Sequence, residues 1–137
     1  VASLSCYDEA LLEDEDVLVM NETLILFEEI CNSRWFANTP FILFLNKRDL
    51  LAKKLKDGVS LKVCFKDYKE SKYNDDQQKY DNAYNFIKKK FEDRNHSDKK
   101  TVYVHETCAT DKDSVEKVFN DVQHIVISAS LHRGGLV

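Results

Sequence analysis

The chain has 137 residues, 43% hydrophobic and 32% charged, which suits one globular domain with a buried core. Its net charge of −4 excludes nucleic-acid binding driven by bulk electrostatics, and we find no apolar run long enough to cross a bilayer. Three glycines and one proline predict regular secondary structure rather than loops or linkers. The four cysteines are widely spaced without a C-x-x-C pair, so we expect reduced, mostly buried thiols. Because it opens on Val1, we expect a piece of a longer protein.

The first half of the chain predicts two strands and two helices. Residues 1–5, VASLS, are expected to form a strand. Apolar side chains at helical spacing predict an amphipathic helix over residues 20–31. The run 41–45 is apolar at every position and predicts a strand covered on both faces, as in a parallel sheet. A short helix is expected over 50–56, ending near Gly58.

The second half predicts helix, strand and helix. Residues 61–80 are polar and tyrosine-rich and give no clear prediction. Residues 80–91 carry a helical stripe, and 101–107, TVYVHET, predict a strand. The last helix is expected over about 113–132, with a valine-rich stripe that we expect to belong to the core, and a capping box from Thr110 and Asp113.

This alternation predicts an α/β fold with a parallel sheet flanked by helices. In such sheets ligands bind beyond the carboxyl ends of the strands. Two polar segments follow strands here: residues 46–49, NKRD, and residues 106–111, ETCATD.

The first segment has the chemistry to recognise guanine. The Asp49 carboxylate offers two acceptors in one plane, which match the ring N1–H and the exocyclic amino group of guanine. Sites of this design can discriminate between bases by about 10⁴ or more. Asn46 can bond the base edge and brace a neighbouring loop, and the stem of Lys47 can lie over the base. The small Ala109 lets its backbone N–H approach the guanine carbonyl oxygen.

These motifs resemble those of a known family. NKRD is similar to the N-K-x-D guanine-specificity loop of GTP-binding proteins, and TCATD resembles the T-C-A-T motif of heterotrimeric G-protein α subunits. The segments ICNSRWF and FLNKRDL are also similar to that family, and the resemblance covers nearly the whole chain, 1–137. It implies part of a Ras-like P-loop NTPase fold, namely the C-terminal part of the GTPase domain. The base-binding residues that it implies are Asn46, Lys47, Asp49, Cys108, Ala109 and Thr110.

The resemblance also implies ligands and partners. GTP or GDP would bind, together with Mg²⁺ whose ligands are expected outside this chain. Partners would be a G-protein βγ dimer, a G protein-coupled receptor engaging the last helix and tail, and an effector near Trp35–Phe36. Location at the cytoplasmic face of the plasma membrane, as a peripheral protein, is likewise implied.

The phosphate-binding motifs of this family are missing from the sequence. Neither G-x-x-x-x-G-K-[ST] nor D-x-x-G occurs, and the glycines stand at positions 58, 134 and 135. We therefore expect no catalytic residue and no metal ligand in this chain, and no GTP hydrolysis by the isolated polypeptide, although the intact protein would be a GTPase.

Two other functions stay open at this point. The chain could be a non-catalytic interaction fragment that binds a receptor through its last helix, or part of a monomeric Ras-like GTPase. Trp35 and Phe36 could also be core anchors rather than an effector surface.

Overall fold

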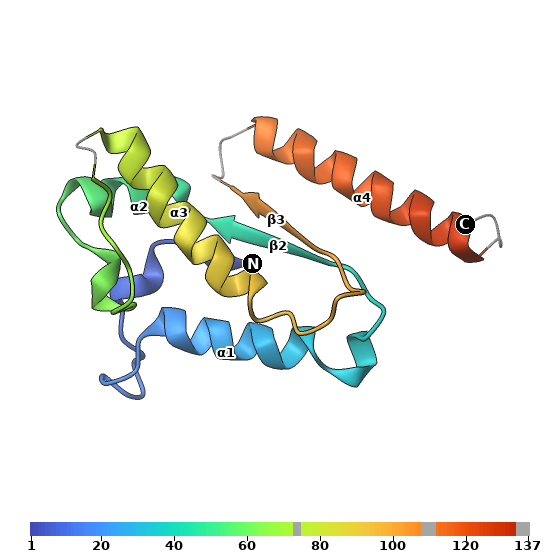
Figure 1. Ribbon diagram of the computed structural model, residues 1–137, viewed down its shortest axis with the longest axis horizontal. Coiled ribbons are helices and arrows are strands. Elements are labelled where there is room, and N and C mark those ends of the chain that lie inside the picture. The colour runs from blue at the N-terminus through green and yellow to red at the C-terminus, as the bar shows by residue number, and fades with distance from the viewer. Residues whose placement is uncertain (73–74, 108–111, 134–137) are drawn as a thin grey trace.

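The computed structural model describes residues 1–72, 75–107 and 112–133 (Figure 1). Helices and strands alternate in the predicted order. The strands are β1 (Ala2–Ser3), β2 (Phe41–Asn46) and β3 (Val102–Glu106), and the α-helices are α1 (Val19–Cys31), α2 (Arg48–Lys56), α3 (Asp76–Glu92) and α4 (Lys112–Arg133). Short 3₁₀ turns occupy η1 (Cys6–Asp8), η2 (Arg34–Phe36) and η3 (Leu61–Val63).

The described strands form one parallel sheet in the order β1-β2-β3, which confirms the predicted fold class. Phe41 lies opposite Val102 and Leu45 lies opposite Glu106, so β2 and β3 end at the same edge of the sheet. The residues that directly follow these two strands, Lys47 and Thr107, therefore lie at the same edge of the sheet.

The main core lies between one face of the sheet and helices α1 and α3. From the helices, Leu24 and Ile87 are almost fully buried, and the rings of Phe27 and Phe91 meet edge to face at 5.6 Å. This contact joins α1 to α3 and fixes how both helices cover the sheet. Apolar side chains at helical spacing predicted both helices correctly.

β2 is covered on both faces, as expected, but the two faces are buried to different extents. Leu43 and Leu45 are buried, whereas Ile42 and Phe44 are half-buried. Successive side chains of a strand point to opposite faces. Phe44 pairs in register with His105, whose ring bonds Asp121 of α4, so this second face is the one on which α4 lies. In Figure 1, α4 runs beside β3, on the other side of the strands from α1.

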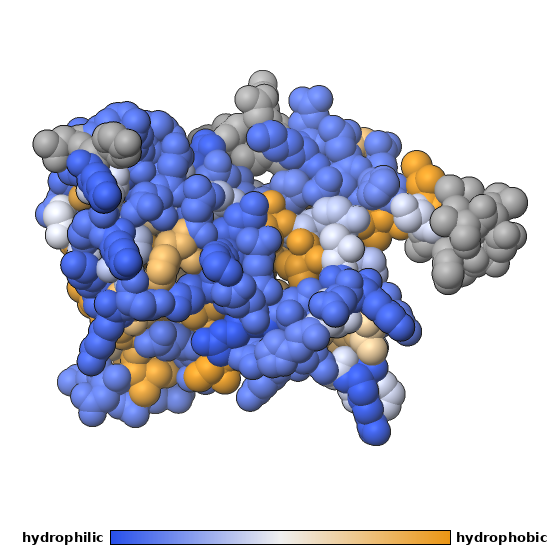
Figure 2. All heavy atoms as spheres, in the orientation of Figure 1, coloured by the Kyte–Doolittle hydropathy of each residue, from blue (hydrophilic) through white to orange (hydrophobic). Residues whose placement is uncertain are grey.

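The predicted core role of the α4 stripe is wrong for three of its members. Phe119 is 61% exposed, Val122 40% and Val126 56%, while Val118 and Ile125 are half-buried. A single helix resting on one strand can bury only a narrow stripe, so its flanks stay in contact with solvent. Figure 2 shows hydrophobic residues along α4 on a face that is otherwise mostly hydrophilic.

Residues 61–72, for which the sequence pattern predicted no element, pack against α3. Leu61, Phe65 and Tyr68 are buried, and the last two rings meet Phe86 edge to face at 5.4 and 5.0 Å. Asp75 then begins α3, because its carboxylate accepts a hydrogen bond from the backbone N–H of Gln77.

The three cysteines in the described part of the chain are buried or half-buried. Cys6 and Cys31 are buried and Cys64 is half-buried, all three without a disulfide, which confirms the prediction for these residues; Cys108 lies outside the described residues. Burial raises the pKa of the Cys6 and Cys64 thiols to about 11. Within the described ranges, no helix is long and apolar enough to cross a membrane.

A polar cluster joins the end of α1 to the end of α3. Arg94 donates to the Glu28 carboxylate at 2.5 Å, and the His96 ring lies 3.2 Å from the same carboxylate. Asn32 donates to the carbonyl oxygen of Arg94 at 2.7 Å and accepts from the backbone N–H of His96 at 2.9 Å. The hydrogen bond from Arg94 is the main cause that lowers the pKa of Glu28 below its ordinary 4.5.

We expect this cluster to make stability fall in acid. A carboxyl whose pKa is lower in the folded state stabilises the fold above its unfolded pKa, and that contribution disappears as the pH falls through the folded value. Arg94→Met should therefore have a lower melting temperature than the wild type at pH 6. The difference should shrink as the pH falls below about 4.5. Lys89→Met, which removes an exposed pair with Asp93 on the same helix, is the matched control and should show a gap near zero. A gap for Arg94→Met that stayed constant from pH 6 to pH 3 would contradict the assignment.

Candidate functional site

Thr107 holds the carboxyl ends of β2 and β3 together. Its backbone N–H donates to the carbonyl of Leu45 at 2.8 Å, and its hydroxyl donates to the side-chain oxygen of Asn46 at 3.2 Å. Its own carbonyl accepts from the backbone N–H of Arg48 at 3.4 Å. The side-chain oxygen of Asn46 thus contacts the residue that follows β3.

Lys47 turns the chain sharply from β2 into α2. It has φ 61° and ψ 42°, a left-handed conformation that no other non-glycine residue adopts in the described part of the chain. Such a conformation costs a β-carbon-bearing residue on the order of 1–3 kcal/mol and is found most often at functional sites. Here it lets α2 begin directly at the strand end, with the Lys47 carbonyl accepting from Leu50 and Leu51.

Asp49 lies in the first turn of α2, not in an irregular loop. The helix begins at Arg48, two residues before the predicted start at Leu50. A carboxylate is favourably placed near the N-terminus of a helix, where the backbone dipole is positive. The Asp49 side chain is exposed, so its two oxygens are available to a ligand at this edge of the sheet.

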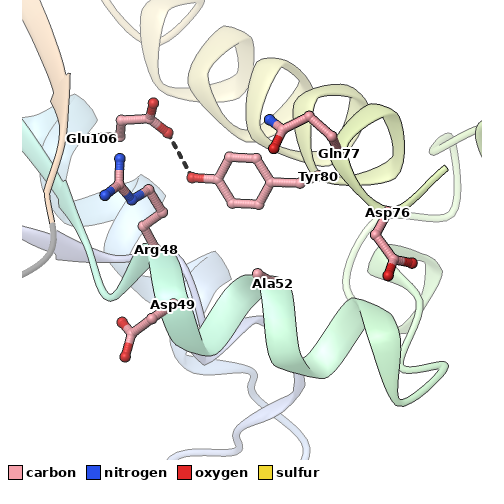
Figure 3. A pocket seen from close by; sticks show the side chains of 7 residues that line it. All are labelled: Arg48, Asp49, Ala52, Asp76, Gln77, Tyr80 and Glu106. Atoms are coloured by element: carbon pink, nitrogen blue, oxygen red, sulfur yellow. Dashed lines mark hydrogen bonds between the residues drawn. The ribbon is translucent and has the colours of Figure 1, made fainter.

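A cavity of about 330 Å³ opens beside this turn, between α2 and α3 (Figure 3). Inside it the Tyr80 hydroxyl donates to the Glu106 carboxylate at 2.6 Å. Burial and this carboxylate raise the pKa of Tyr80 far above its usual range, so the hydroxyl remains a donor. The cavity is lined by Arg48, Asp49, Ala52, Asp76, Gln77, Tyr80 and Glu106.

Sequence reasoning missed the polar partners at the end of β3. The sequence pattern places Tyr80 in a helical stripe and indicates no polar role for Tyr80 or His105. His105 bonds Asp121 and so attaches α4 to β3. Within residues 1–72, 75–107 and 112–133, no three His, Cys, Asp or Glu side chains gather where they could hold a metal ion.

The structure therefore brings Asn46, Lys47 and Asp49 to one edge of the sheet. Cys108, Ala109 and Thr110 lie outside the described residues, and with Thr110 so does the first member of the predicted capping box of α4. That these six residues bind a guanine base stays a prediction.

A parallel α/β sheet with polar residues after two adjacent strands is typical of ligand-binding domains, nucleotide-binding domains among them. A family model described as "G-protein alpha subunit" matches residues 1–126 of this chain. The chain belongs to the G-protein α subunit family.

Curated relatives agree with this assignment. The chain is 46% identical over 136 residues to the guanine nucleotide-binding protein alpha-3 subunit of Caenorhabditis elegans, and to the alpha-2 subunit of Caenorhabditis briggsae. It is 41% identical over 138 residues to the alpha-17 subunit of Caenorhabditis elegans. These alignments cover 99–100% of the chain but only 36–37% of the relatives.

Proposed function

We propose that residues 1–137 are the C-terminal part of the GTPase domain of a heterotrimeric G-protein α subunit, which transduces receptor signals through a GTP/GDP switch. The observation that carries this proposal is the contact between Thr107 and Asn46. It joins the N-K-x-D segment to the first residue of T-C-A-T, with the exposed Asp49 in the first turn of α2.

In this site each residue has a chemical role. Asp49 accepts from the two guanine donors, and Lys47 lays its alkyl stem over the base while its ammonium group stays hydrated. Asn46 braces the two loops, as its bond to Thr107 supports. Ala109 contributes its backbone N–H to the guanine carbonyl, and Cys108 and Thr110 shape that loop.

Hydrolysis would belong to the longer protein. Phosphate and Mg²⁺ would be held by residues outside this chain, as the family resemblance implies, and Mg²⁺ would neutralise phosphate charge there. The residues described here bind and orient the base. We accordingly propose that the isolated chain has no catalytic residue and does not hydrolyse GTP.

The partner surfaces are assigned by resemblance and supported by exposure. Trp35 is 78% exposed with the Arg34 guanidinium 5.0 Å from its ring centre, and Phe36 is 40% exposed. These values argue against a core anchor at Trp35 and suit an effector surface. A receptor would bind α4 and the tail. The whole protein would contact the βγ dimer and the plasma membrane.

Family membership favours this function over a monomeric Ras-like GTPase. The second candidate, a non-catalytic fragment that binds a receptor through its last helix, is favoured by one observation. The apolar residues Phe119, Val122 and Val126 of α4 are exposed and could contact a partner.

Competition binding to the full-length protein separates these candidates. GDP and ADP would compete against fluorescent N-methylanthraniloyl-GDP, and we expect GDP to be preferred by about 10⁴, because adenine leaves the Asp49 carboxylate without its donors. Equal competition by ADP, or no binding of the fluorescent nucleotide, would refute recognition of guanine. The second candidate, a non-catalytic interaction fragment, would then be favoured.

A further inference from the structure

The pair formed by Tyr80 and Glu106 lies in the cavity beside Asp49, and the proposed function assigns it no role. Glu106 is the last residue of β3, and the residue after it, Thr107, makes three hydrogen bonds to the end of β2 and the start of α2. Tyr80 reaches Glu106 from the first turns of α3, 26 residues away in the sequence. The pair therefore connects a helix to the strand end that carries Thr107.

The environment makes this hydrogen bond strong and well oriented. Tyr80 is only 8% exposed, and its ring stacks on Tyr84 with centroids 6.1 Å apart and planes 3° from parallel. Hydrogen bonds to a charged acceptor are roughly twice as strong as neutral ones. A hydroxyl held by a buried, stacked ring has little freedom, so it fixes the direction of the Glu106 carboxylate.

Arg48 extends the connection to the N-K-x-D segment. Figure 3 shows its guanidinium pointing toward Glu106 and Tyr80, from the first residue of α2. Its positive charge acts on the Tyr80 hydroxyl, as does the negative charge of Glu106. One side chain from each of α2, α3 and β3 thus converges on the same point.

We propose that Tyr80 and Glu106, facing Arg48, are positioning residues that hold the ends of β2 and β3 in register for the nucleotide base. This rests on the proposed function. Their role is exerted through Thr107 and requires no contact with the base. If the pair is broken, the strand end that carries Thr107 loses its support from α3, and the bound nucleotide should leave faster.

The test measures release of N-methylanthraniloyl-GDP from the full-length protein after a chase with excess GDP. Tyr80→Phe removes only the hydroxyl, and we expect its dissociation rate to rise about tenfold, which corresponds to about 1.4 kcal/mol. Glu106→Ala should do the same. Glu106→Gln keeps an acceptor for Tyr80 and should rescue much of the loss. Both changes break the same hydrogen bond. The double variant Tyr80→Phe/Glu106→Ala should therefore release the nucleotide no faster than either single variant.

Two controls separate positioning from general destabilisation. Tyr84→Phe removes a hydroxyl from the same stacked pair, and Ile87→Val removes a methylene group from a fully buried side chain of the same helix. Ile87→Val should lower the melting temperature without accelerating release of the nucleotide. If Ile87→Val accelerates release as much as Tyr80→Phe, or if the effects of Tyr80→Phe and Glu106→Ala multiply, positioning is refuted.

The outcomes also distinguish this inference from the function on which it rests. A wild-type protein that binds no guanine nucleotide would overturn both. A wild-type protein that binds guanine nucleotide, with Tyr80→Phe releasing it at the wild-type rate, would overturn the positioning role alone.

Discussion

Replacing Asp49 by asparagine is expected to convert the site from guanine to xanthine recognition. The substitution exchanges one acceptor oxygen for an NH₂ donor, which opposes the exocyclic amino group of guanine. Xanthine carries a carbonyl at that position and accepts from the new donor. Because buried polar groups left unpaired are costly, the ratio of affinities for GDP and xanthosine diphosphate should change by about 10⁴.

Isothermal titration of the full-length protein with both diphosphates measures this ratio. Asp57→Asn is the matched control, because it makes the same chemical change in an exposed residue at the other end of α2. Its preference should stay with GDP. An Asp49→Asn protein that still prefers GDP would remove Asp49 from the base site.

Truncating Phe91 should cause a large loss of stability in the 137-residue chain. The side chain is 1% exposed and meets Phe27 edge to face, so Phe91→Ala leaves a cavity between α3 and α1. Substitutions of this kind cost about 3–5 kcal/mol, which is a large share of the stability of a small domain. Urea denaturation followed by circular dichroism at 222 nm gives the free energy of unfolding.

Phe119→Ala is the matched control, because it makes the same substitution at an exposed position. Phe119 is 61% exposed on α4, and exposed substitutions usually change stability by no more than about 0.5 kcal/mol. Comparable losses for the two variants would mean that α4 packs more closely than this structure shows.

Side-chain periodicity predicted most of the fold because it reports which face of an element is buried. The stripe through Leu24 and the stripe through Ile87 each identified a helix, and the run beginning at Phe41 identified the central strand. Residues 61–72 were missed because their burial comes from an aromatic cluster, around Phe86, that has no regular spacing.

The candidate site was predictable in part, for a similar reason. Asn46, Lys47 and Asp49 are close in sequence and follow a recognisable strand, so their spacing indicated their chemistry. The bond from Tyr80 to Glu106 joins residues that have no pattern in common, and only the packing of α3 against β3 brings them together. Exposure of the α4 stripe could not be read from the sequence either, because periodicity identifies an apolar face without indicating how much of it is covered.

The protected thiols have a practical consequence for spectroscopy of this protein. Maleimide and iodoacetamide reagents attack the thiolate, and a thiol with a pKa of about 11 is ionised in about one molecule in a thousand at pH 8. Cys6 and Cys64 should therefore react slowly while the fold is intact. A cysteine introduced at an exposed position of α4, such as Val126→Cys, would be modified much sooner and could carry a fluorophore or spin label. Fluorescence or electron paramagnetic resonance could then follow α4 without first removing Cys6 or Cys64.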